Sequence, residues 1–71
     1  MIFNNKEVKA MASEIVEKGI EFKKGTVGGY SIEIVESDPE SHTSFIYYEE
    51  EMARDVDFDI LTQLRFNNVT S

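Results

Sequence analysis

The stretch NNKEVKAMASEIVEKGIEFK, residues 4–23, decides the fold because the spacing of its apolar residues changes within it. In its first part they recur every three or four positions, which is the spacing of one helix face. Asn4 and Glu7 form a variant of the capping box at the beginning, and Gly19 is a typical residue at a helix end. We therefore expect a helix from about residue 5 to residue 18.

After this helix the apolar residues alternate with polar ones, and a period of two predicts β-strands. We expect a short strand at residues 20–23, followed by a reversal through the glycine-rich segment GTVGG. A second strand begins at Tyr30 and ends before the turn signature SDPES, residues 37–41. The β-branched and aromatic residues from Thr43 to Glu49 predict a further strand.

The segment from residue 55 to residue 66 fits two structures. Val56, Phe58 and Ile60 alternate with aspartates, and this period of two favours a strand. The alternative is a helix. One face of that helix would gather Met52, Val56, Ile60, Leu61 and Leu64.

The 71 residues are expected to form one small acidic domain that spans residues 1–71. The predicted class is α+β, with an N-terminal helix packed on one face of a small antiparallel sheet of three to four strands. The element order is α-β-β-β-β, with a helix as the alternative for the last element. The helix should cover the sheet face that carries Tyr30, Ile32, Ile34, Phe45, Tyr47, Val56, Phe58 and Ile60.

The opposite sheet face is expected to mix apolar and acidic residues, namely Glu33, Val35, Ile46, Tyr48, Glu50, Asp57, Asp59 and Leu61. An apolar centre inside a charged rim is typical of a protein–protein interface. We expect self-association as a homodimer through an exposed sheet edge or through Val35, Ile46, Tyr48 and Leu61. The alternative is that these are the scattered apolar residues that any protein surface carries.

Acidic residues are concentrated in the second part of the chain. Ten of the fourteen lie after Tyr30, where Arg54 and Arg65 are the only basic residues, and the net charge of the chain is −7. The resulting field attracts basic proteins and repels nucleic acids and anionic membranes. We expect a basic protein partner, no direct nucleic-acid binding and no membrane contact.

Asp55, Asp57 and Asp59 would form a row if they shared one strand face. Two strand rises would separate them by about 6.8 Å, a spacing similar to that of successive phosphates in a nucleic acid. With Glu49–Glu51 they would offer carboxylates to Lys and Arg side chains that normally bind phosphate. The predicted partner-binding residues are Glu33, Tyr48, Glu50, Asp55, Asp57 and Asp59. The alternative is a solvated edge whose charges only prevent aggregation.

No pattern of catalytic or metal-binding residues competes with a binding function. The chain has no cysteine, so disulfides and thiolate sites are excluded. A calcium loop beginning at Asp55 would need glycine where Ile60 stands and glutamate where Phe66 stands. His42 is the one histidine and belongs to a predicted turn, where it is a poor base for a serine nucleophile. We expect no enzymatic activity, no metal and no cofactor.

No apolar run approaches the roughly 20 residues that span a bilayer. The first residues also lack the layout of a secretory signal. Together with the absence of cysteine, this favours the cytoplasm. The sequence thus predicts a small acidic interaction protein that binds and inhibits a basic, nucleic-acid-handling protein through a carboxylate-rich face, as a nucleic-acid mimic. The alternative is a homo-oligomeric structural or accessory subunit whose acidity serves solubility.

Overall fold

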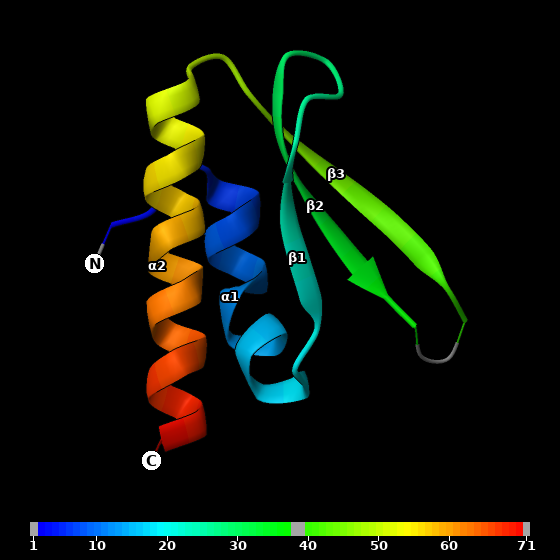
Figure 1. Ribbon diagram of the computed structural model, residues 1–71, viewed down its shortest axis with the longest axis vertical. Coiled ribbons are helices and arrows are strands. Elements are labelled where there is room, and N and C mark those ends of the chain that lie inside the picture. Colours follow the sequence, from blue (N-terminus) through cyan, green and yellow to red (C-terminus); the bar gives the residue numbers. More distant parts are fainter. Residues whose placement is uncertain (1, 38–39, 71) are drawn as a thin grey trace.

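The computed structural model describes residues 2–37 and 40–70, which form the element order α-β-β-β-α (Figure 1). The elements are α1 (Lys6–Lys18), β1 (Glu21–Gly25), β2 (Tyr30–Glu36), β3 (His42–Tyr48) and α2 (Glu51–Thr70). The three strands form an antiparallel sheet in the order β1-β2-β3. The predicted α+β class is confirmed, and the last element is a helix rather than a fourth strand. Two residues of the predicted turn at 37–41, residues 38 and 39, lie outside the described residues.

Helix α1 has nearly the predicted bounds, but its N-cap is Asn5 and not Asn4. The Asn5 side chain accepts hydrogen bonds from the backbone N–H groups of Glu7 and Val8, at 2.8 and 3.3 Å. This cap satisfies amides that have no partner inside the helix. Gly19 ends the helix with a φ of 66°, in the left-handed region that favours glycine. Asn4 instead forms hydrogen bonds with α2.

Residues 55–66 belong to α2, so the predicted strand is wrong in this segment. The buried face of α2 contains Arg54, Asp57 and Leu61, which recur at the spacing of a helix. Asp57 is charged and lies in the middle of this face, so the apolar stripe of the helix is interrupted in the sequence. The alternative helical face was right for Leu61, which is fully buried, but wrong for Met52 and Val56, which are 75% and 42% exposed.

The sheet register reverses the face that we predicted for β3. Ile32 of β2 pairs with Ile46 of β3, so their side chains lie on the same face. Ile46 and Tyr48 are therefore buried beneath the helices, whereas Phe45 and Tyr47 lie on the other face and are 38% and 55% exposed. The sequence did not reveal the register because β3 has large apolar or aromatic residues on both faces.

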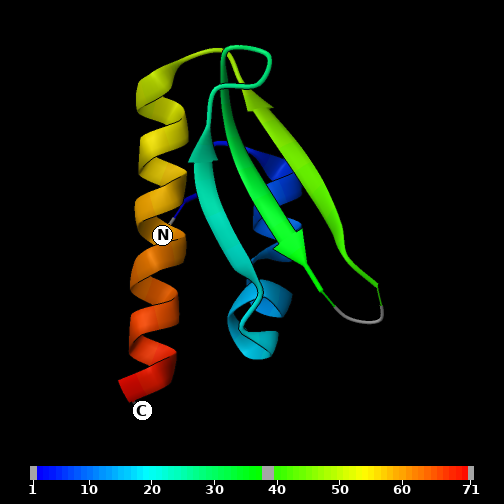
Figure 2. The same ribbon diagram turned by 45° about the vertical axis from the view of Figure 1, so that its right-hand side comes forward.

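Both helices pack on one face of the sheet, with α1 behind it and α2 alongside β1 (Figure 2). The core between these layers contains Val8, Ala12, Ile15, Ile32, Ile34, Ile46, Tyr48 and Leu61. Phe22 of β1 and Phe58 of α2 pack edge to face beside this core, with ring centroids 5.2 Å apart. Within the described ranges, neither helix combines the length and the apolar character that a bilayer span requires.

Candidate interaction surface

The three aspartates of the predicted row point to different parts of the molecule. They lie on α2, where residues two positions apart are separated by about 200° around the helix axis. Asp57 is fully buried, Asp55 is half-buried and Asp59 is exposed. The predicted row of carboxylates on one strand face is therefore wrong, and each aspartate has an environment of its own.

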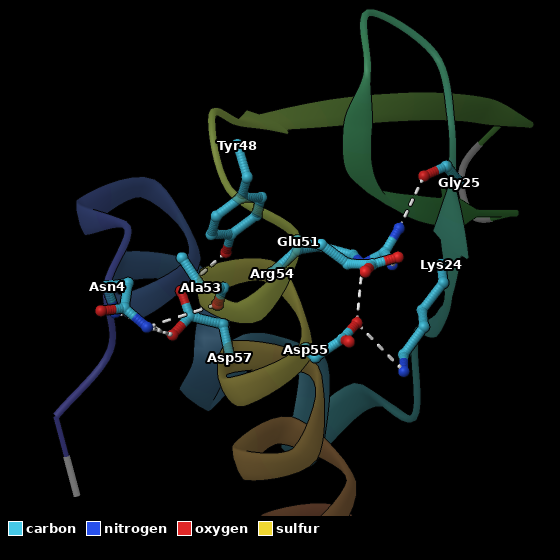
Figure 3. Close-up of polar contacts among 9 residues, drawn as sticks. All are labelled: Asn4, Lys24, Gly25, Tyr48, Glu51, Ala53, Arg54, Asp55 and Asp57. Carbon is cyan, nitrogen blue, oxygen red and sulfur yellow. Dashed lines mark hydrogen bonds and ion pairs between the residues drawn. The ribbon is translucent and has the colours of Figure 1, made fainter.

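Asp57 holds the beginning of α1 (Figure 3). Its Oδ1 accepts hydrogen bonds from the backbone N–H of Asn4 at 2.7 Å and from the Asn4 side-chain amide at 3.2 Å. Its Oδ2 accepts from the backbone N–H of Asn5 at 3.0 Å and from the hydroxyl of Tyr48 at 2.7 Å. Burial and, second, the hydrogen bond to Asp57 raise the pKa of Tyr48 well above its usual value. Asp57 thus ties α2 to α1 and β3, and it is not available to a partner.

Asp55 is paired with two cations of its own chain (Figure 3). Its Oδ1 lies 3.2 Å from Nζ of Lys24 and accepts a hydrogen bond of 2.9 Å from Nε of Arg54. The hydrogen bonds from Lys24 and, second, from Arg54 lower the pKa of Asp55. Arg54 is itself buried and donates a second hydrogen bond, of 3.0 Å, to the carbonyl of Gly25. The charge of Asp55 is therefore neutralised within the fold.

Arg65 makes similar contacts at the other end of β1. It donates hydrogen bonds to the carbonyls of Ile20 at 3.2 Å and Gly19 at 3.3 Å. Its guanidinium also lies 5.8 Å from the centre of the Phe22 ring. Arg54 and Arg65 therefore both attach α2 to the ends of β1. Sequence reasoning treated them only as counter-charges, although their isolation among carboxylates was a signal that each had a specific role.

The remaining predicted partner-binding residues do not form one face. Glu33 lies on the sheet face opposite the helices, which we call the open face. Its carboxylate is 3.9 Å from Nζ of Lys23, and 18% of its side chain is exposed. Glu50 is exposed just before α2, and Asp59 is exposed on α2 itself. Of the predicted set, hydrogen bonds within the described residues join only Tyr48 and Asp57, and they join them in the interior.

The surface predicted for self-association does not exist in this fold. Ile46, Tyr48 and Leu61 are only 4%, 8% and 0% exposed, because β3 has the opposite register and residues 55–66 are helical. Val35 lies on the open sheet face, where it is half-buried. A dimer contact through all four residues would require the core to open.

Exposed carboxylates gather instead where β3 leads into α2. Glu49, Glu50 and Glu51 are all exposed, and so are their neighbours Tyr47 and Met52, at 55% and 75%. We call these five residues the junction surface. Among the described residues, no cation lies within ion-pair distance of the first two glutamates. The junction surface therefore combines unpaired negative charge with exposed apolar area.

The junction surface includes the beginning of α2, and this position stabilises one of its three neighbouring negative charges. Glu51 is in the first turn of α2, where the helix dipole favours negative charge, and its carboxylate is 3.5 Å from Nη2 of Arg54. A shallow groove of about 290 Å³ lies at the junction surface, between the beginning of α1 and the end of β3. The groove is lined by Asn4, Asn5, Tyr47, Tyr48, Glu49, Glu50 and Ala53.

Two arrangements that could support catalysis, a metal-binding group of side chains and a pairing of His42 with Ser31, are not found in the described ranges. No group of three or more His, Asp or Glu side chains is placed there to hold a metal ion. His42 begins β3, where its Nε2 is 3.4 Å from the carboxylate of Glu36. Ser31, whose buried hydroxyl has no hydrogen-bond partner among the described residues, lies opposite Tyr47 in the register of β2 and β3. Five strand positions, about 17 Å, separate Tyr47 from His42. The histidine and this serine therefore cannot act as base and nucleophile.

Comparisons with known proteins gave no matching family model, no matching curated protein and no matching solved structure. The surface and the charge of the chain are therefore the basis for a functional proposal.

Proposed function

We propose that this protein is a small, acidic, non-enzymatic binding protein that captures and inhibits a basic, nucleic-acid-handling protein in the cytoplasm. The junction surface makes the contact and acts as a nucleic-acid mimic toward the phosphate-binding residues of the partner. One observation supports this most strongly. The three consecutive glutamates Glu49–Glu51 are exposed, and Tyr47 and Met52, which lie close to them in the sequence, are exposed as well.

The different environments of the acidic residues support this location for the binding surface. Asp57 is buried and Asp55 is held by Lys24, so the fold itself uses these two carboxylates. Glu49 and Glu50 have no comparable partner among the described residues. Charge that the fold does not neutralise contributes most to the field that steers a basic protein toward the surface.

Tyr47 and Met52 supply the apolar part of the contact. Tyrosine and methionine are enriched in interfaces, in which charged residues surround an apolar centre. Lys and Arg have long apolar stems that can lie on a tyrosine ring while their charged ends meet carboxylates. Glu49 and Glu50 would then occupy the places of phosphates, so the partner could not bind nucleic acid through the same residues.

The proposal is tested by capture of proteins from a lysate of the native host on the immobilised chain, at low and high salt. We expect a basic nuclease, polymerase or repressor that is released as salt rises. Salt weakens such a contact because charges are screened over about 8 Å at physiological ionic strength. The double variant Glu49→Lys, Glu50→Lys should lose this partner.

The matched control is the double variant Glu17→Lys, Glu21→Lys. Both glutamates are exposed, and they lie where α1 leads into β1, at the opposite end of the molecule from the junction surface (Figure 1). Each double variant turns two negative charges into two positive ones, so the net charge becomes −3 instead of −7 in both. Equal loss of capture would show that only net charge acts. Full capture by the junction variant would contradict the proposal.

A homo-oligomeric structural or accessory subunit is the second candidate function. It is supported by the open sheet face and by the edge of β3, which no described segment covers (Figures 1 and 2). Salt would strengthen this association, because it screens the repulsion between copies that each carry −7. The two candidates therefore differ in the sign of their salt dependence.

A further inference from the structure

The two edges of the sheet differ in how they are protected. Helix α2 runs alongside β1, where Arg54 donates to the carbonyl of Gly25 and Arg65 to those of Ile20 and Gly19 (Figure 2). Three of the five residues of β1 are charged. Charged side chains and a covering helix both prevent an edge strand from pairing with another chain. The β1 edge is therefore protected.

The β3 edge has none of these protections. The residues from Thr43 to Tyr48 are all uncharged and include no proline, and no described segment lies beyond β3 in either view (Figures 1 and 2). An edge strand presents backbone N–H and C=O groups that point away from the sheet and lack partners. On the open face of the sheet this strand also carries Phe45 and Tyr47, which are 38% and 55% exposed.

We propose that β3 pairs with β3 of a second copy of this chain, antiparallel about a two-fold axis. The two three-stranded sheets would then form one continuous sheet. An edge strand is self-complementary in this arrangement, because each unpaired N–H meets an unpaired C=O of the copy. Phe45 and Tyr47 of the two copies lie side by side on the open face and bury apolar surface.

The charge pattern of β3 favours a second copy of this chain over a basic strand as the occupant. No carboxylate lies between Thr43 and Tyr48, so the edge itself offers nothing that attracts Lys or Arg. Antiparallel pairing also brings His42, at the beginning of one β3, toward Glu49 and Glu50, which follow the end of the other. The dimer does not rest on the proposed function, since it needs no basic partner, but both contacts use Tyr47 and therefore compete for this side chain.

Sedimentation equilibrium of the full chain over the micromolar range, at low and high salt, tests the dimer. We expect a dimer whose dissociation constant decreases as salt rises. Phe45→Lys places two like charges close to the two-fold axis and should raise the dissociation constant about tenfold or more. Val27→Lys is the control, because it makes the same charge change at a 46% exposed position between β1 and β2. It should change the dissociation constant by less than about twofold.

Hydrogen exchange locates the contact independently of any substitution. The amides of β3 should exchange more slowly at high than at low protein concentration, whereas those of β1 should not change. Three results would each overturn the proposal: a monomer at high micromolar concentration, a dimer that Phe45→Lys leaves intact, or concentration-dependent protection confined to other elements. Protection of β3 that appears only when a basic protein is added would also overturn it, because the occupant would then be different.

Discussion

Replacement of Asp57 by asparagine should destabilise the fold strongly, although it removes one charge and almost no volume. The buried carboxylate accepts four hydrogen bonds, from two groups of Asn4, from the backbone of Asn5 and from Tyr48. An asparagine side chain has one acceptor oxygen, and its NH₂ group can only donate. Whichever way the amide turns, its NH₂ group faces the backbone N–H of either Asn4 or Asn5. One donor at the beginning of α1 therefore loses its acceptor.

The magnitude follows from the hydrogen bonds that are lost. A buried donor without an acceptor costs about 1–3 kcal/mol, and the loss of charge from the other hydrogen bonds adds to this. We therefore expect Asp57→Asn to lower the free energy of unfolding by about 2–4 kcal/mol. A domain of this size has a total stability of roughly 4–10 kcal/mol. The melting temperature should accordingly fall by more than about 10 °C.

Urea denaturation followed by circular dichroism measures this loss. Asp59→Asn is the matched control, because Asp59 lies on the same helix, undergoes the same exchange and is exposed. It should change the free energy of unfolding by less than about 0.5 kcal/mol. A double-mutant cycle with Tyr48→Phe should show coupling, since both changes act on one hydrogen bond. Equal stability of the Asp57 and Asp59 variants would refute the role that we assign to the buried carboxylate.

Three further predictions concern the pH dependence of stability, the contacts of Arg54 and the negative electrostatic field of the chain. The pKa of Tyr48 in the folded state is raised above its ordinary value of 10.0, so the unfolded chain loses this proton first. The free energy of unfolding should therefore fall as pH rises above about 10, and denaturation in urea at several pH values should show a smaller fall for Tyr48→Phe. Arg54→Lys should lower the free energy of unfolding by about 1–3 kcal/mol, because lysine cannot contact the Gly25 carbonyl and Asp55 in the same geometry; an unchanged urea midpoint would contradict this. The chain should not retard duplex or single-stranded nucleic acid in a mobility-shift assay at micromolar concentration, and a salt-sensitive shift would contradict the inferred field.

Local interactions made α1 predictable from the sequence. Its period, its asparagine cap and Gly19 act within a few residues of one another, so a short window contains the information. The error of one position at the cap arose because Asn4 and Asn5 are both suitable residues. Asn4 donates a hydrogen bond to Asp57 instead, and these two residues are 53 positions apart. No local pattern reveals that contact.

The same long-range contact explains why α2 was predicted as a strand. Asp57 lies on the buried face because its carboxylate accepts hydrogen bonds from backbone amides at the beginning of α1. A pattern of charged and apolar residues instead predicts that a charged residue is exposed. The face predicted for β3 was wrong for a related reason. Whether Ile46 or Tyr47 faces the core depends on where the helices pack, and β3 alone does not show this. Of the predicted binding residues, Glu50 remains exposed in the junction surface, whereas the fold buries Asp57 and pairs Asp55 with Lys24.

The most direct test of the central claim is competition between this protein and nucleic acid for the captured partner. Fluorescence anisotropy of a labelled oligonucleotide bound to the purified partner reports the displacement. We expect the native chain and the Glu17→Lys, Glu21→Lys variant to displace the oligonucleotide with similar midpoints, and the Glu49→Lys, Glu50→Lys variant to displace none at the same concentrations. An oligonucleotide that stays bound while the native chain joins the complex would contradict the claim that the junction surface occupies the phosphate-binding residues.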